Sequence, residues 1–224
     1  MNKYLTLAAA LLVASGAAQA TTIVEWDLLG APGSQASTPA SGEAANVTGS
    51  VLARGAALTG SAAGNSISAS GWTGEATDYF SFGFAVESGY QVDLDDLYIG
   101  TRSSGTGPGT MGLFYSGDNF GAALTTFNQA PGSNFVNSVI DLSALPDLTG
   151  NVEFRLLQVG TAAANGGSTG SAGTFRVTGY FAGGSFDRNT QLTGTVSAIP
   201  EPRTYLMMFA GLVMIGFMAA RRKS

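Results

Sequence analysis

The sequence contains no cysteine and no histidine, and its two lysines, Lys3 and Lys223, lie at its ends. Without cysteine the chain forms no disulfide, so a hydrophobic core must provide its stability. The missing residues also exclude Ser-His-Asp triads, Cys-His dyads and zinc sites that need imidazole or thiolate. The glycines between Gly105 and Gly112 form no Walker A loop, because that loop requires a lysine.

Positive charge is scarce throughout the central part of the chain. Residues 21–199 carry five arginines and fourteen acidic residues, so their formal charge is 5 − 14 = −9. A surface of this kind lacks the basic footprint that nucleic acid or anionic lipid requires. We therefore expect no nucleic-acid partner, and cations or neutral glycans are better matched to this composition.

The first twenty residues have the pattern of a secretory signal peptide. Lys3 gives a short positive region, residues 5–14 are apolar, and Ala18 and Ala20 form a small-residue cleavage site. An uncleaved membrane helix is disfavoured because the apolar stretch is too short to span a bilayer. The sequence thus predicts export through the secretion machinery, cleavage by signal peptidase and a mature chain that begins at Thr21.

The last twenty-five residues, 200–224, have a different order of features. Pro200, Glu201 and Pro202 precede an uncharged apolar run, residues 204–220, which ends at the basic residues Arg221, Arg222 and Lys223. The prolines prevent a helix from extending toward the N-terminus. A helix over the run would be ~25 Å long, slightly less than the ~30 Å hydrocarbon core of a bilayer. A basic cluster directly after such a run is typical of a cytoplasmic end, so we expect a short transmembrane helix with a cytoplasmic basic stop.

This order of motif, apolar segment and basic end resembles the PEP-CTERM sorting signal of Gram-negative bacteria. The resemblance implies recognition by an exosortase, a membrane-embedded, cysteine-dependent processing enzyme. It further implies an inner-membrane intermediate, removal of the tail and delivery to the cell surface or to the extracellular, exopolysaccharide-containing matrix of a biofilm. Arg203 departs from the small residue usual at that position. A plain C-terminal membrane anchor is the alternative.

The passenger, residues 21–199, has an all-β pattern. It is rich in Gly, Ser, Thr and Ala, with short apolar alternations and no long helical period. Phe80, Phe82 and Phe84 share one face of the clearest strand, 79–86, and we expect them in the core. Roughly eight to ten such segments predict an antiparallel two-sheet β-sandwich, jelly-roll-like. A β-solenoid is the alternative, but the sequence has no fixed period.

Residues 80–181 also resemble a passenger domain common among PEP-CTERM proteins. The resemblance lies in the strand 89–94, in Arg102, Ser103 and Ser104 before Gly107 and Pro108, in 142–150, and in 173–177. It implies a sandwich domain and no particular biochemical activity. The segment 180–189 is an insertion relative to this pattern, and we interpret it as a longer hairpin.

Two groups of residues are candidate ligand sites. Asp93, Asp95 and Asp96 lie where the apolar alternation of 90–99 changes phase, which predicts a bulge or tight turn. Their carboxylates are suited to Ca²⁺, but a solvated turn without a metal is favoured, because no EF-hand or repeated Asp-Gly loop supplies the remaining ligands. Trp72 lies among glycines beside Glu75 and Asp78, where it could stack on a sugar or close one end of the sandwich.

The arginines and the remaining acids allow further interpretations. Arg155 and Arg176 interrupt apolar strands and either reach a sugar or carboxylate ligand or pair with Glu153 or another acid. Glycoside hydrolysis needs only two carboxylates, but the compact Glu-x-Asp-x-Glu arrangement of jelly-roll glycanases is missing. We therefore do not expect an enzyme.

The predicted function is structural or adhesive, with weak glycan or calcium binding. The alternatives are a secreted glycoside hydrolase and an ice-binding or other flat-surface adhesin. The adhesin would need a regular array of exposed threonines, and Thr190, Thr193 and Thr195 form too short a ladder for it.

Overall fold

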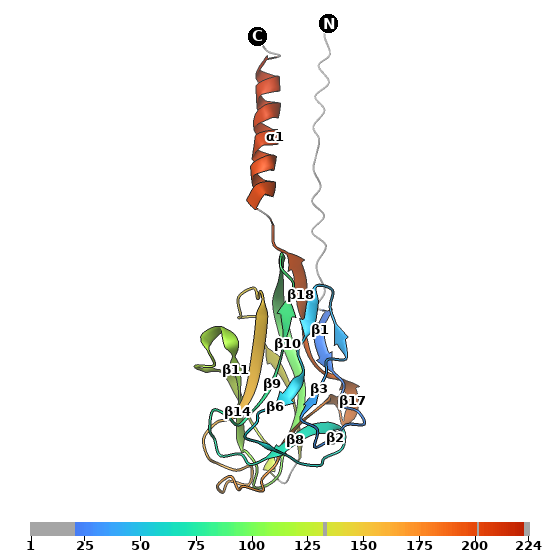
Figure 1. The fold of residues 1–224 in the computed structure, drawn as a ribbon, viewed down its shortest axis with the longest axis vertical. Coiled ribbons are helices and arrows are strands. Elements are labelled where there is room, and N and C mark those ends of the chain that lie inside the picture. Colours follow the sequence, from blue (N-terminus) through green and yellow to red (C-terminus); the bar gives the residue numbers. More distant parts are fainter. Residues whose placement is uncertain (1–20, 132–133, 201, 222–224) are drawn as a thin grey trace.

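The passenger is built from two stacked β-sheets (Figure 1). The computed structural model describes residues 21–131, 134–200 and 202–221. The larger sheet has the order β2-β8-β15-β10-β18-β1-β4, with β13 also paired to β10 and β7 to β8. Its strands are β1 (Thr21–Trp26), β2 (Pro32–Gly33), β4 (Gly42–Glu43), β7 (Thr59–Gly60), β8 (Ser66–Ser70), β10 (Tyr90–Ser103), β13 (Phe135–Asp141), β15 (Phe175–Thr178) and β18 (Thr190–Ala198).

The smaller sheet has the order β12-β11-β14-β9-β6-β3, with β5 also paired to β9. Its strands are β3 (Ser37–Thr38), β5 (Val47–Gly49), β6 (Leu52–Arg54), β9 (Tyr79–Val86), β11 (Thr110–Tyr115), β12 (Ala123–Asn128) and β14 (Asn151–Gln158). A short 3-10 helix, η1 (Ser116–Asp118), follows β11. The predicted all-β sandwich is confirmed, and the solenoid alternative is wrong because both sheets pair strands that are distant in the sequence.

Aromatic side chains from both sheets fill the space between them. Phe80, Phe82 and Phe84 alternate along β9 and are all buried, as the period-two pattern predicted. The Phe82 ring lies 5.4 Å from the Trp26 ring in a T-shaped arrangement and 5.9 Å from the Phe154 ring in a stacked one. Each such side chain buries about 150–250 Å² and contributes several kcal/mol, which allows a fold without disulfides.

The long central strand β10 contains the predicted irregularity. Its register with β18 shifts between Leu94 and Leu97, so Asp95 and Asp96 form a bulge. Val92 and Leu94 before the bulge and Leu97 after it are all buried. Because of the extra residue, the apolar side chains on both halves of the strand point into the same core.

The insertion between β15 and β18 folds over the outer face of the larger sheet. β15 and β18 both pair with β10, and between them the chain forms a separate hairpin, β16 (Tyr180–Ala182) and β17 (Ser185–Arg188). The chain crosses β10 at Gly100, where any Cβ would collide with the carbonyl oxygen of Gly179. The Tyr180 ring packs against the Tyr98 ring at 5.5 Å. The predicted longer hairpin is confirmed.

The pairing of β1, β10 and β18 gives the sandwich a tail end and a distal end. Thr21 pairs with Gly194, and Tyr90 pairs with Ala198, so the start of β1 lies close to the point where β18 leads into the tail. The helix α1 (Pro202–Arg221) extends away from this end (Figure 1). Ser103, at the other end of β10, pairs with Phe175. The loops that follow β10 and precede β15 therefore lie at the distal end.

Candidate functional site

The tail lies outside the sandwich core. The buried core residues all fall between Ile23 and Leu192. Pro200 is exposed, and α1 begins at Pro202 and ends at Arg221, close to the expected bounds. Its exposed apolar side chains are Met208, Phe209, Leu212, Val213, Met214, Ile215 and Met218. Glu201, Arg222 and Lys223 lie outside the described residues, as do Ala18 and Ala20 of the predicted signal peptide.

The transmembrane prediction for this helix is not confirmed. Over the part of the chain that the structure describes, no helix combines the length and the apolar character needed to cross a membrane.

Trp72 does not form a sugar platform. Its side chain is only 1% exposed, and its indole Nε1–H donates to the carbonyl oxygen of Ala69 at 3.0 Å. Its ring packs against those of Phe80 and Phe175. The nearby Asp78 is also buried and accepts hydrogen bonds from the backbone N–H and the hydroxyl of Thr73. The glycan-contact prediction for Trp72 is therefore wrong, because the tryptophan closes the distal end of the core.

The three clustered aspartates do not form a ready calcium site. Asp93 is exposed, whereas the carbonyl oxygen of Asp95 accepts the Leu142 N–H at 2.7 Å. The Asp96 N–H donates to the hydroxyl of Thr193. Within residues 21–131, 134–200 and 202–221, no three His, Cys, Asp or Glu side chains gather as metal ligands would. Asp95 and Asp96 belong to the bulge, whereas Asp93 precedes it in regular pairing with Thr195.

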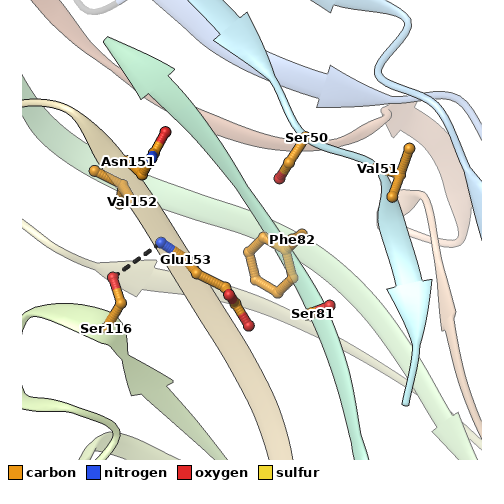
Figure 2. A pocket seen from close by; sticks show the side chains of 8 residues that line it. All are labelled: Ser50, Val51, Ser81, Phe82, Ser116, Asn151, Val152 and Glu153. Carbon is orange, nitrogen blue, oxygen red and sulfur yellow. Dashed lines mark hydrogen bonds between the residues drawn. The ribbon is translucent and has the colours of Figure 1, made fainter. Parts of the chain in front are cut away.

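A hollow of about 450 Å³ lies on the outer face of the smaller sheet, between β14, β9 and the β5–β6 connection (Figure 2). Its lining includes Ser50, Val51, Ser81, Ser116, Asn151 and Glu153. Figure 2 shows the Glu153 N–H donating to the Ser116 hydroxyl oxygen at 3.0 Å.

Glu153 is the one carboxylate among the residues that line this hollow, and it is paired. Its Oε1 accepts from Arg155 Nε at 2.6 Å, so the predicted pair of Arg155 with Glu153 is confirmed. The Arg155 guanidinium lies between two rings, 4.3 Å from the centroid of Tyr79 and 3.9 Å from that of Phe120. Because glycoside hydrolysis requires two carboxylates across the substrate, this hollow does not provide the necessary pair.

The threonines near the C-terminal strand do not form an ice-binding face. Thr190 and Thr193 are buried in β18, and the Thr190 hydroxyl donates to the carbonyl oxygen of Thr178 at 2.7 Å. These side chains are therefore occupied in joining β18 to its neighbours.

An unusual cluster of two arginine side chains and one phenylalanine lies at the distal end of the larger sheet, on its outer face. Arg102 in β10 pairs directly with Arg176 in β15, and on its other side with Phe135 in β13. Each guanidinium lies 5.1 Å from the centroid of the Phe135 ring. Like charges directly opposite each other on antiparallel strands are destabilising, so this arrangement calls for a compensating interaction.

A hollow of about 180 Å³ lies beside the two arginines. Apart from the two arginines, the lining of this hollow consists largely of hydroxyl-bearing side chains, namely Ser61, Ser68, Ser104 and Thr174. The Ser104 hydroxyl oxygen accepts the Thr174 N–H at 2.9 Å, which leaves its own hydrogen free to donate. Burial, with a smaller contribution from the charge of Arg102, lowers the pKa of Arg176.

A second hollow of about 410 Å³ lies on the other side of Phe135. It is lined by Asn134, Phe135, Asn137, Phe181 and Gly184, so the β16–β17 hairpin forms one wall. The Phe181 ring lies 6.2 Å from the Phe135 ring and 5.8 Å from that of Phe186. Phe135 and Phe186 are 48% and 43% exposed, so an aromatic surface continues from the arginines.

The sequence predicted that Arg176 would pair with an acidic residue or contact a ligand, and it did not join Arg176 to Arg102 or Phe135. The predicted pairing of Arg176 with an acid is wrong, because the ion pairs among the described residues are those of Arg155 and Arg188. The two arginines lie on separate strands, and the scarcity of basic residues in the passenger was the one signal that could have singled them out. Only the register of β10 against β13 and β15 places them side by side.

Strand pairing and tail together define a β-sandwich protein with a helical extension after its last strand. Residues 198–223 match the family model of the PEP-CTERM protein-sorting motif, so the chain carries this motif and the predicted resemblance is confirmed. A search of curated proteins finds no match.

Solved structures that resemble the chain include family 29 carbohydrate-binding modules. A single-residue variant in complex with cellulohexaose has 14% identity and a TM-score of 0.40, over 78% of this chain and 90% of that chain. A second variant has 14% identity and a TM-score of 0.39, over 86% and 99%. Another module has 14% identity and a TM-score of 0.38, over 84% and 98%. TM-scores this low carry no weight for a shared fold or ligand.

Proposed function

We propose that the chain is exported and processed by an exosortase at its C-terminal tail, and that it then acts on the cell surface or in the extracellular matrix. The proposed route includes a signal peptide and an inner-membrane intermediate in a Gram-negative host. The proposed role of the passenger is structural or adhesive, without catalysis, and includes weak glycan binding. The observation that carries the proposal is the sorting motif at residues 198–223.

The position of the tail supports its removal. The last core residue, Leu192, precedes the motif, and α1 leaves its described apolar side chains exposed rather than packed on the sandwich. Cleavage near Pro200 would therefore expose no part of the core. The start of β1 lies at the same end, so both processing events would occur on one side of the domain and leave the distal end free.

The surface around Phe135 supports the proposed weak glycan binding. Phe135 is an exposed aromatic side chain between two hollows, one with hydroxyl groups and arginines and one with two asparagines. Exposed aromatic rings beside hydrogen-bonding groups suit ligands with both apolar and polar parts. Calcium is not included, since no cluster of three acidic ligands occurs among the described residues.

The experiment that tests the sorting proposal is mass spectrometry of the protein from its native host, with and without the exosortase. We expect an extracellular form that ends near Pro200 in the strain that has the enzyme, and not in the strain that lacks it. A double Pro200→Ala, Pro202→Ala variant should accumulate uncleaved, whereas Pro39→Ala, at an exposed position in the sandwich, should be processed normally. An intact chain that stays in the membrane of both strains would contradict the proposal.

A further inference from the structure

We propose that the hollow beside Arg102 and Arg176 binds the carboxylate group of an acidic polysaccharide, whose sugar rings lie along Phe135. The anion site follows from this chain's own residues. The choice of a polysaccharide as its carrier rests on the proposed function at the surface or in the matrix.

The first argument concerns charge. The passenger has fourteen acidic residues and five arginines, yet two of those arginines lie directly opposite each other. The two ion pairs found among the described residues use Arg155 and Arg188 instead. Within the same residues, neither Arg102 nor Arg176 forms a salt bridge. A carboxylate bound to both guanidinium groups would offset one of their two positive charges and reduce the repulsion between them.

The second argument concerns hydrogen bonding. The guanidinium groups present a planar fork of N–H donors that matches the two oxygens of a carboxylate. Among the described residues, the guanidinium groups of Arg102 and Arg176 donate no side-chain hydrogen bond, unlike those of other arginines. Ser104 adds a hydroxyl whose oxygen already accepts from Thr174, so its hydrogen is directed to a ligand or to solvent. The lining residues thus include two cationic donors and no acidic side chain, which favours an anionic ligand over a cation.

The third argument concerns size and continuity. The hollow of about 180 Å³ accommodates a carboxylate with part of its sugar ring. The hollow of about 410 Å³ on the other side of Phe135 could take the next sugar unit, with the amides of Asn134 and Asn137 as hydrogen-bonding partners. Phe135 lines the second hollow and contacts the two arginines that line the first, an arrangement that fits a polymer better than a single small anion.

The fourth argument concerns placement. Arg102 and Arg176 lie near the distal end of β10 and β15, whereas the sorting motif begins at the opposite end of β18. A protein attached through the C-terminal end of β18 would therefore present the arginines away from the surface that carries it. Many copies on one surface would strengthen individually weak contacts with a long polymer.

The test uses the full chain purified in detergent micelles and three probes, which are polygalacturonate, its fully methyl-esterified form and inorganic phosphate. We expect polygalacturonate to bind, as measured by isothermal titration calorimetry, and the uncharged ester to bind at least about tenfold more weakly. Arg102→Gln and Arg176→Gln should each weaken polygalacturonate binding by about tenfold or more. Arg188→Gln removes the same charge from the hairpin and should leave the affinity within about twofold.

Phe135→Ala separates a polymer site from a simple anion site. We expect it to weaken polygalacturonate binding and to leave phosphate binding unchanged. Equal binding of the ester and the acid would overturn the role of the anion. Binding of phosphate alone would overturn the polysaccharide, and no binding of any probe would overturn the whole inference. Because micelle-bound protein needs no exosortase, failure here is distinguishable from failure of the sorting experiment.

Discussion

Arg102 and Arg176 face each other across β10 and β15, and both guanidinium groups lie at the same distance, 5.1 Å, from the ring centroid of Phe135. Contacts of this kind with an aromatic face are favourable by about 0.5–1 kcal/mol at exposed sites. The ring therefore offsets the repulsion between the arginines in the unliganded protein. A bound anion would add direct interactions with both guanidinium groups.

Loss of Arg176 should weaken ligand binding without weakening the fold. Arg176→Gln removes a like-charge pair worth roughly 0.2–1 kcal/mol, and it also removes a contact with Phe135 of similar size and opposite sign. Because the two effects nearly cancel, we expect its free energy of unfolding, measured by urea denaturation, to change by less than about 0.5 kcal/mol. Arg155→Gln should instead lower it by about 1–2 kcal/mol, because Arg155 pairs with Glu153 and lies between two rings. A clear destabilisation by Arg176→Gln would indicate a structural role for that residue.

Trp72 should behave as a core residue. Trp72→Ala removes a large buried ring and its hydrogen bond to Ala69, so the expected loss is about 3–5 kcal/mol in the free energy of unfolding. Phe135→Ala removes a ring that is 48% exposed and should cost less than about 1.5 kcal/mol. Thermal unfolding followed by near-UV circular dichroism compares the two variants. Similar losses in both would show that Phe135 belongs to the core rather than to a ligand surface.

Gly100 should be required for the hairpin to cover the outer face. In Gly100→Ala the new methyl group meets the carbonyl oxygen of Gly179, and the Gly100 backbone is held by strand pairing. We expect a loss of about 2 kcal/mol or more and weaker amide hydrogen-exchange protection in β16 and β17. Gly64→Ala is the matched control, because nothing lies within 4 Å of its Cβ position and its φ is not in the left-handed region. An unchanged stability of Gly100→Ala would contradict this role of the glycine.

The pKa of Asp141 should depend on Ser143. The Ser143 hydroxyl donates to Asp141 Oδ1 at 2.6 Å and its backbone N–H at 2.9 Å, and these bonds lower the pKa of Asp141 below its ordinary value of 3.8. Because the folded pKa is the lower one, the stabilisation is present above the unfolded pKa and is lost as the pH falls through the folded pKa. Ser143→Ala should raise the pKa, as measured by NMR titration of the Asp141 carboxyl carbon. Ser138→Ala, on the same strand, should not.

Local patterns predicted much of the fold because the side chains of a strand alternate between its faces. The three phenylalanines of β9 could be assigned to the core without any knowledge of their partners. The bulge at Asp95 and Asp96 could likewise be placed, because an extra residue is needed to keep both halves of the strand facing one core. Short strands could be expected between Glu43 and Gly71, but their individual bounds could not be predicted, since scattered small residues give no clear period.

Ligand-site predictions were less successful, because exposure and neighbours depend on the whole fold. Trp72 and the aspartates of β10 were selected from residue type and spacing, yet Trp72 is buried and only Asp95 and Asp96 share the bulge. The pair of Arg155 with Glu153 could be anticipated because residues two apart on a strand share a face. Arg102 and Phe135 had no such local relationship.

The sequence by itself determined that this protein carries a sorting motif, and it determined the class of fold. The sorting motif is a linear order of proline, apolar segment and basic end, and β-strand alternation is likewise a property of consecutive residues. Tertiary structure decided which faces are covered and which charges meet. Sheet register brought Phe135, Arg102 and Arg176 into one row, and Gly100 let the hairpin fold beside them. Such a site exists only after distant strands pair, because no single segment contains its parts.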